Sequence, residues 1–167
     1  MMKSFAILTL VLFNYALHAQ GVKNKVVGNY HDLFSSQLEV KADSTFSYAW
    51  HFDMASSWSQ GTWHMKNDTL YLKTILVYDT LRISKPDGKI VDSLVLSADR
   101  QSERITSINI IDAISSGGQN RSPCPVKLFF KNEKLIGIDK QGKLFMEKVS
   151  GIFNLKKRRT WYIKEKR

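Results

Sequence analysis

Residues 45–52 alternate aromatic side chains with small or polar ones, and this run constrains the fold more than any other part of the chain. It reads Thr-Phe-Ser-Tyr-Ala-Trp-His-Phe, so an extended strand would carry four aromatic side chains on one face. A helix would spread these four rings around its axis, because it repeats every 3.6 residues. The run therefore predicts a half-buried β-strand whose aromatic face covers a core.

Shorter alternating runs, separated by turn residues, continue along the chain and indicate further strands. We expect these at residues 37–41, 61–65, 69–72, 81–84, 90–96, 126–130, 135–138, 143–149 and 160–164. The linking segments carry turn residues, such as Pro86 and Gly88 between two of the runs. About nine or ten strands at this spacing favour an antiparallel barrel or sandwich over an α/β fold.

One segment departs from the strand pattern. Ile105, Ile108, Ile111 and Ile114 recur at helical spacing, although part of the segment also fits a strand, so both a short helix and a strand remain open. Residues 115–125 are rich in Ser, Gly and Pro and predict a long loop within one domain.

Residues 1–19 have the composition of a secretory signal peptide. Lys3 supplies a positive charge, residues 5–16 are mostly apolar, and a small-residue cleavage site precedes Gln20. A transmembrane anchor would need about 20 apolar residues, and polar side chains interrupt this stretch earlier. We therefore expect an exported protein, periplasmic or extracellular, whose mature chain forms a single domain over residues 20–167.

Positive charge is concentrated near the C-terminus. The formal charge is +10, and residues 126–167 hold 13 basic and 4 acidic residues, whereas residues 20–125 hold 11 of each. The densest run consists of Lys156, Lys157, Arg158 and Arg159. A basic run with aromatic neighbours can bind anionic lipid or polysaccharide. The alternative is a solvated C-terminal segment that binds nothing.

Two short motifs resemble those of the small exported lipocalin-like proteins. Residues 27–30 read Val-Gly-Asn-Tyr at the start of the mature domain, and residues 61–63 read Gly-Thr-Trp. The resemblance implies an up-and-down antiparallel β-barrel of about eight to ten strands. In many relatives the apolar interior of such a barrel holds a small hydrophobic molecule. This chain has only one Cys and so lacks the disulfide of the classical lipocalins.

Six aromatic side chains are candidates for the interior of such a barrel. We expect inward positions for Phe46, Tyr48, Trp50, Phe52, Trp63 and Tyr71. These rings form either a packed core or the wall of an apolar pocket. Two hypotheses follow: an exported non-catalytic protein with a small hydrophobic ligand in its interior, or an envelope-binding module that uses the basic run. We expect a monomer with no cofactor and no nucleic-acid partner.

Catalytic and metal-binding motifs are not evident in the sequence. If residues 45–52 pair with residues 60–65, His51 and His64 lie on facing strands and Asp53 shares their face, a combination that could hold Zn²⁺ or Cu²⁺. Their spacing matches no metal motif, so a pair of surface histidines is the simpler interpretation and no metal is predicted.

The single thiol, Cys124, lies between two prolines, and no neighbouring residue would lower its pKa. The sequence contains no nucleophile elbow, no phosphate-binding loop and no zinc-protease signature. An enzyme is therefore not indicated, and a hydrolase with an unrecognised site is the third hypothesis.

Overall fold

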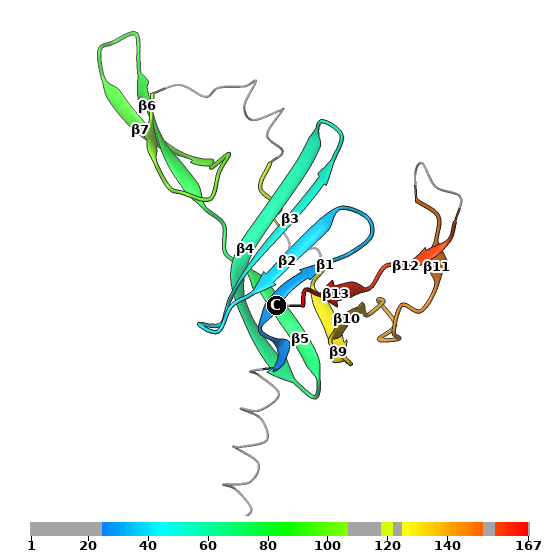
Figure 1. Ribbon diagram of the computed structural model, residues 1–167. Helices are drawn as coiled ribbons and strands as arrows, with labels where there is room; N and C mark the ends of the chain where they lie inside the picture. Colours follow the sequence, from blue (N-terminus) through cyan, green and yellow to red (C-terminus); the bar gives the residue numbers. More distant parts are fainter. Residues whose placement is uncertain (1–24, 107–117, 122–124, 152–155, 167) are drawn as a thin grey trace, which may run out of the picture.

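The computed structural model describes residues 25–106, 118–121, 125–151 and 156–166, and a closed β-barrel lies at its centre (Figure 1). The eight strands of the barrel are β1 (Gly28–His31), β2 (Ser36–Val40), β3 (Thr45–Phe52), β4 (Ala55–Lys66), β5 (Thr69–Thr74), β9 (Lys127–Lys131), β10 (Lys134–Gly137) and β13 (Tyr162–Lys164). Neighbouring strands follow one another in chain order and are antiparallel, and β13 closes the barrel against β1. The predicted all-β antiparallel barrel is confirmed.

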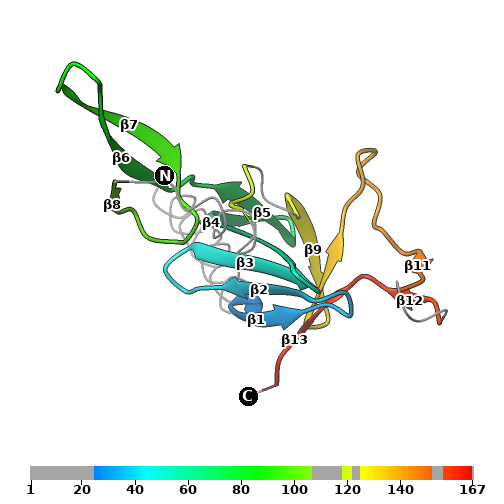
Figure 2. The ribbon, with the colours of Figure 1, turned by 90° about the horizontal axis from the view of Figure 1, so that it is seen from above.

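Two small sheets lie outside the barrel. The first joins β6 (Tyr78–Ser84), β7 (Ile90–Leu96) and β8 (Arg104–Ile105), and its sequence is inserted between β5 and β9. The second pairs β11 (Lys148–Val149) with β12 (Arg158–Arg159), between β10 and β13. Figures 1 and 2 show both sheets projecting away from the barrel.

The strand predicted at residues 143–149 is mostly wrong. Only its last two residues form a strand, and that strand pairs outside the barrel with β12. The preceding residues fold back on β10 through a single bridge between Ile138 and Leu144. The physical reason is that β9 pairs along all of β10 and β13 pairs with Lys134 and Leu135, so this segment reaches only the end of β10, where the Phe145 nitrogen donates to the Gly137 carbonyl at 2.8 Å.

Tight turns join the barrel hairpins as the sequence pattern suggests. The β4–β5 turn has positive φ at Asn67 (48°) and Asp68 (56°), and the β9–β10 turn has the same conformation at Asn132 (50°) and Glu133 (58°). Two-residue turns with positive φ at both positions match the right-handed twist of the strands that they join.

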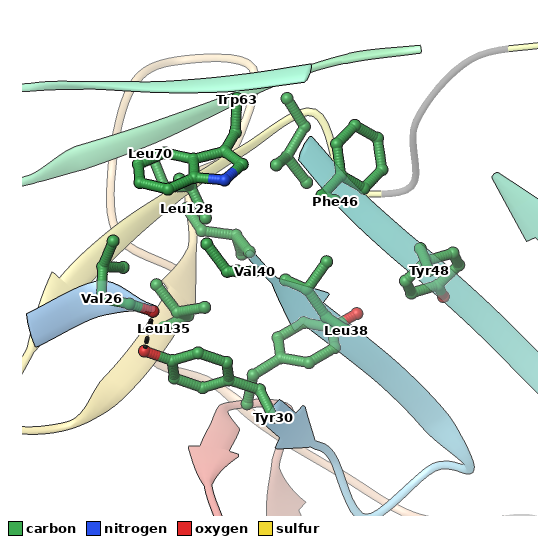
Figure 3. Close-up of a cluster of buried hydrophobic side chains, with 12 residues drawn as sticks. Val26, Tyr30, Leu38, Val40, Phe46, Tyr48, Trp63, Leu70, Leu128 and Leu135 are labelled. Carbon is green, nitrogen blue, oxygen red and sulfur yellow. Dashed lines mark hydrogen bonds between the residues drawn. The ribbon is translucent and has the colours of Figure 1, made fainter. Parts of the chain in front are cut away.

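Twelve buried side chains form the core inside the barrel, and Figure 3 shows most of them converging there. The cluster consists of Val26, Tyr30, Leu38, Val40, Phe46, Tyr48, Trp63, Leu70, Leu72, Leu128, Leu135 and Tyr162. Polar atoms within it have partners: the Tyr30 hydroxyl donates to the Val26 carbonyl at 2.7 Å, and Trp63 Nε1 donates to the Lys41 carbonyl at 2.9 Å.

Several predictions fall outside the described residues. They concern the signal peptide at residues 1–19, Cys124, and three of the four isoleucines at helical spacing; the fourth, Ile105, lies in β8. In the ranges that the structure describes, no helix is long and apolar enough to cross a membrane.

Candidate functional site

The aromatic face of β3 runs from the barrel core toward its rim. Phe46 and Tyr48 are buried in the core, and Trp63 of β4 joins them there. Trp50 and Phe52, farther along β3, are only partly buried and stack on each other, with ring centroids 6.3 Å apart. Three of the six predicted interior aromatics therefore fill the core, and two lie toward one end of the barrel.

Tyr71, the sixth predicted interior aromatic, lies on the outer face instead. Its neighbours on β5, Leu70 and Leu72, both belong to the core, and alternate residues of a strand point to opposite faces. The Tyr71 ring stacks on the exposed His64, with centroids 5.0 Å apart. The expectation of an inward Tyr71 was wrong because this strand has apolar residues on both faces.

Hydroxyl groups line part of the barrel interior. The Tyr48 hydroxyl donates to Ser36 Oγ at 3.2 Å. Burial, with a smaller contribution from Tyr48, raises the pKa of Tyr162 above its ordinary range. Ser59 lies opposite Tyr48 and is fully buried, yet neither its Oγ nor Oγ1 of Thr74 has a hydrogen-bond partner among the described residues. Such hydroxyls are candidates for contact with a ligand or an ordered water.

Two cations lie over the ring of Trp161, one from the C-terminal basic run and one from β10. Arg159 Cζ lies 4.3 Å from the ring centroid of Trp161, and Lys134 Nζ lies 5.2 Å from it. Lys148 is directly opposite Arg159 in the β11–β12 pair. Both cation–ring distances lie within the range of cation–π interaction.

We define the basic cluster as Lys134, Lys148, Lys156, Lys157, Arg158 and Arg159. Sequence reasoning missed Lys134 and Lys148, because strand pairing, which no local motif signals, brings them to the cluster.

His51 and His64, which the sequence analysis interpreted as surface histidines, are both exposed, and the alternative in which they hold one metal ion is not formed. His51 pairs with Ser56, whereas His64 lies eight residues farther along β4 and pairs with Tyr71. Eight residues of extended strand span about 26 Å. Within the described ranges, no three His, Cys, Asp or Glu side chains are placed to hold one metal ion.

Two clefts that the sequence did not predict lie on the outer face of the barrel. The wider cleft, of about 430 Å³, is lined among others by Asn29, Gln37, Glu39, Ser47, Arg100 and Glu165. The smaller one, of about 230 Å³, is lined among others by His51, Trp58, Asp99 and Arg100. The two share Ala49 and Arg100. No sequence signal links these residues, since Arg100 reaches the cleft from the inserted segment.

No protein-family model, curated protein or solved structure matches this chain. The lipocalin-like relationship therefore remains a resemblance in two short motifs and in the barrel fold. Among the described residues, three places can carry chemistry: the interior hydroxyls, the basic cluster and the outer clefts. Of these, the basic cluster brings concentrated charge to an aromatic ring, that of Trp161.

Proposed function

We propose that the protein binds an anionic phospholipid surface through the basic cluster. The observation that carries the proposal is that Arg159 and Lys134 both lie over the Trp161 ring, 4.3 Å and 5.2 Å from its centroid. Tryptophan favours the interface between lipid headgroups and acyl chains, and neighbouring cations are attracted to anionic headgroups. The basic cluster and Trp161 together therefore supply the two side-chain types that a peripheral lipid-binding surface needs.

The shape of this region is compatible with contact to a flat surface. The β11–β12 sheet projects from the barrel (Figure 1). Lys148 and Arg158, one from each of its strands, are exposed. Weak hydration of the arginine guanidinium lowers the cost of placing it beside an aromatic ring and a phosphate. Surface attachment of this kind leaves the barrel core intact.

The test compares the parent protein with a variant in which Lys156, Lys157, Arg158 and Arg159 are all replaced by Gln. Each cation near an anionic surface contributes about 1 kcal/mol. The variant should therefore bind vesicles rich in phosphatidylglycerol about a thousandfold more weakly at low salt. Co-sedimentation measures the difference, and binding by the parent should also fall as salt rises.

A charge-matched variant tests whether vesicle binding depends on the basic cluster or on the positive charge of the protein in general. It replaces four exposed lysines of other elements by Gln: Lys66, Lys73, Lys85 and Lys89. This control should retain most of the vesicle binding. Equal weakening of both variants, or full binding by the cluster variant, contradicts the proposal. If the basic cluster binds an anionic polysaccharide but does not bind vesicles, the proposal of a phospholipid surface is contradicted.

A second candidate function is binding of a small amphipathic ligand inside the barrel, supported by the unpartnered hydroxyls of Ser59 and Thr74. Such a ligand would satisfy these hydroxyls and place its apolar part against the partly buried Trp50 and Phe52. Native mass spectrometry of protein purified from its own host should then detect a bound small molecule. Replacement of Ser59 by Ala should lower the occupancy of that molecule. A spectrum of the bare polypeptide alone contradicts this candidate.

A further inference from the structure

The wider outer cleft lies on the outer side of the barrel wall, and the core lies on the inner side. Asn29, Gln37 and Ser47 point into it, because their strand neighbours, Tyr30, Leu38 and Tyr48 respectively, are directed to the core. Its volume of about 430 Å³ lies within the range of small-molecule sites, about 300–1,000 Å³. Its walls are formed mainly by polar and charged side chains rather than by aliphatic ones.

The loop that follows β7 contributes Arg100 to the cleft and is fixed to the barrel. Trp58 of β4 donates from Nε1 to the Ala98 carbonyl at 3.2 Å. Gln119, itself mostly buried, donates from Nε2 to the Ser97 carbonyl at 3.5 Å. Arg100 Cζ lies 5.9 Å from the ring centroid of Trp58. These contacts hold the Arg100 side chain at the junction of the two clefts.

Arg100 is the one basic side chain among the residues that line the wider cleft. Of the two carboxylates there, Glu39 lies 3.5 Å from Lys41 Nζ, and Glu165 lies 3.7 Å from the imidazole Nδ1 of His31. Arg100 makes no ion pair with any carboxylate of the described residues. A guanidinium offers parallel N–H donors that match the two oxygens of a carboxylate.

The remaining polar groups narrow the class of ligand. Asn29, Gln37 and Ser47 both donate and accept hydrogen bonds, while Glu39 and Glu165 accept them from hydroxyl groups. A doubly charged phosphate would be repelled by the two nearby carboxylates, whereas a singly charged carboxylate surrounded by hydroxyls would be repelled less. This combination of one carboxylate and several hydroxyls is found in sugar acids.

We propose that the wider cleft binds an acidic saccharide, with a uronate carboxylate on Arg100 and ring hydroxyls on Asn29, Gln37 and Glu39. The proposal goes beyond the proposed function, because it concerns a different face of the barrel and a soluble oligosaccharide. The two sites share no residue.

The experiment titrates the full mature chain with trimers of galacturonate, glucuronate and mannuronate, each beside its methyl ester. Isothermal titration calorimetry should detect binding of at least one acidic trimer. Its methyl ester should bind at least about tenfold more weakly, since the ester lacks the charge-assisted bond to Arg100. In NMR spectra, the side-chain amide signals of Asn29 and Gln37 should shift on binding.

Matched variants locate the site. Arg100→Gln should weaken binding of the acidic trimer at least about tenfold, and Lys85→Gln, which removes one charge at the far end of the β6–β7 hairpin, should leave it unchanged. The variant with Gln at the four cluster positions 156–159 should also bind the trimer like the parent.

Three results overturn this inference. The first is that none of the acidic trimers binds, and the second is that the esters bind as tightly as the acids. The third is that the variant with Gln at positions 156–159 loses the trimer while Arg100→Gln keeps it, which would assign the saccharide to the basic cluster. If the protein fails to bind vesicles but binds the acidic trimer, only the proposed function is contradicted. The two proposals can therefore be refuted independently.

Discussion

Replacement of Gly61 by Ala tests the packing between β4 and β5. Gly61 lies opposite Phe46 on one side and Thr74 on the other. A Cβ atom at this position would lie 2.0 Å from the carbonyl oxygen of Lys73 and 3.0 Å from the backbone nitrogen of Ile75. Both neighbours are backbone atoms, so no side-chain rotation can relieve the overlap.

The expected loss of stability follows from the backbone atoms of β5 that must move to make room for the Cβ atom. Overpacking a well-packed interior costs about 1–3 kcal/mol. Shifting β5 away from β4 also strains the hydrogen bond from the Ile75 nitrogen to the Gln60 carbonyl, which is 2.8 Å long. A lost hydrogen bond of this kind costs about 1 kcal/mol. We therefore expect Gly61→Ala to lower the free energy of unfolding by about 2–4 kcal/mol.

Urea denaturation followed by tryptophan fluorescence measures this change. The matched control is Gly118→Ala, because a Cβ atom there meets nothing within 4 Å. The control should change the free energy of unfolding by less than about 1 kcal/mol. The reasoning is refuted if the two substitutions have the same effect within error.

Three further predictions concern single side chains. Trp63→Ala should lower the free energy of unfolding by about 3–5 kcal/mol. Trp50→Ala should lower it by less, because Trp50 is only partly buried. Denaturant titrations of the two variants measure both changes. Burial raises the pKa of Tyr162, so the unfolded chain ionises first and the free energy of unfolding should fall as pH rises above about 10. Tyr162→Phe should show a smaller fall between pH 9 and pH 11 in the same assay. Hydrogen bonds from Thr45 lower the pKa of Asp43, so the stabilisation present above about pH 4 is lost as pH falls further. Asp43→Asn should therefore reduce the loss of stability on acidification, and an unchanged acid profile contradicts this role.

Most of the barrel could be predicted because its strands carry a local signal. The alternating aromatics of residues 45–52 and the turn at Asn67 and Asp68 depend on neighbouring residues alone. The structure also explains why glycine occupies one position in each of the two lipocalin-like motifs. Gly28 has a φ of 149°, and a Cβ there would lie 2.5 Å from Cε of Lys164, while Gly61 faces the backbone of β5.

The features that sequence reasoning missed depend on pairings between distant residues. Tyr71 has apolar neighbours, so the sequence pattern could not assign its face; the structure places it on the outside, stacked on His64. Lys134 reaches Trp161 because β10 pairs with β13, and Arg100 reaches the outer cleft because Trp58 and Gln119 hold its loop. None of these contacts produces a periodic pattern in the sequence.

The inserted segment between β5 and β9 begins and ends at one seam of the barrel. Leu70 pairs directly with Leu128, and the Leu72 nitrogen donates to the Val126 carbonyl at 2.9 Å, so the two flanking strands are already neighbours. An insertion with adjoining ends can change in length or composition without altering the register of the strands beside it. Arg100 belongs to this insertion. Changes in the length or composition of this one surface segment should therefore leave the pairing of β5 with β9, and the barrel core beside it, unchanged.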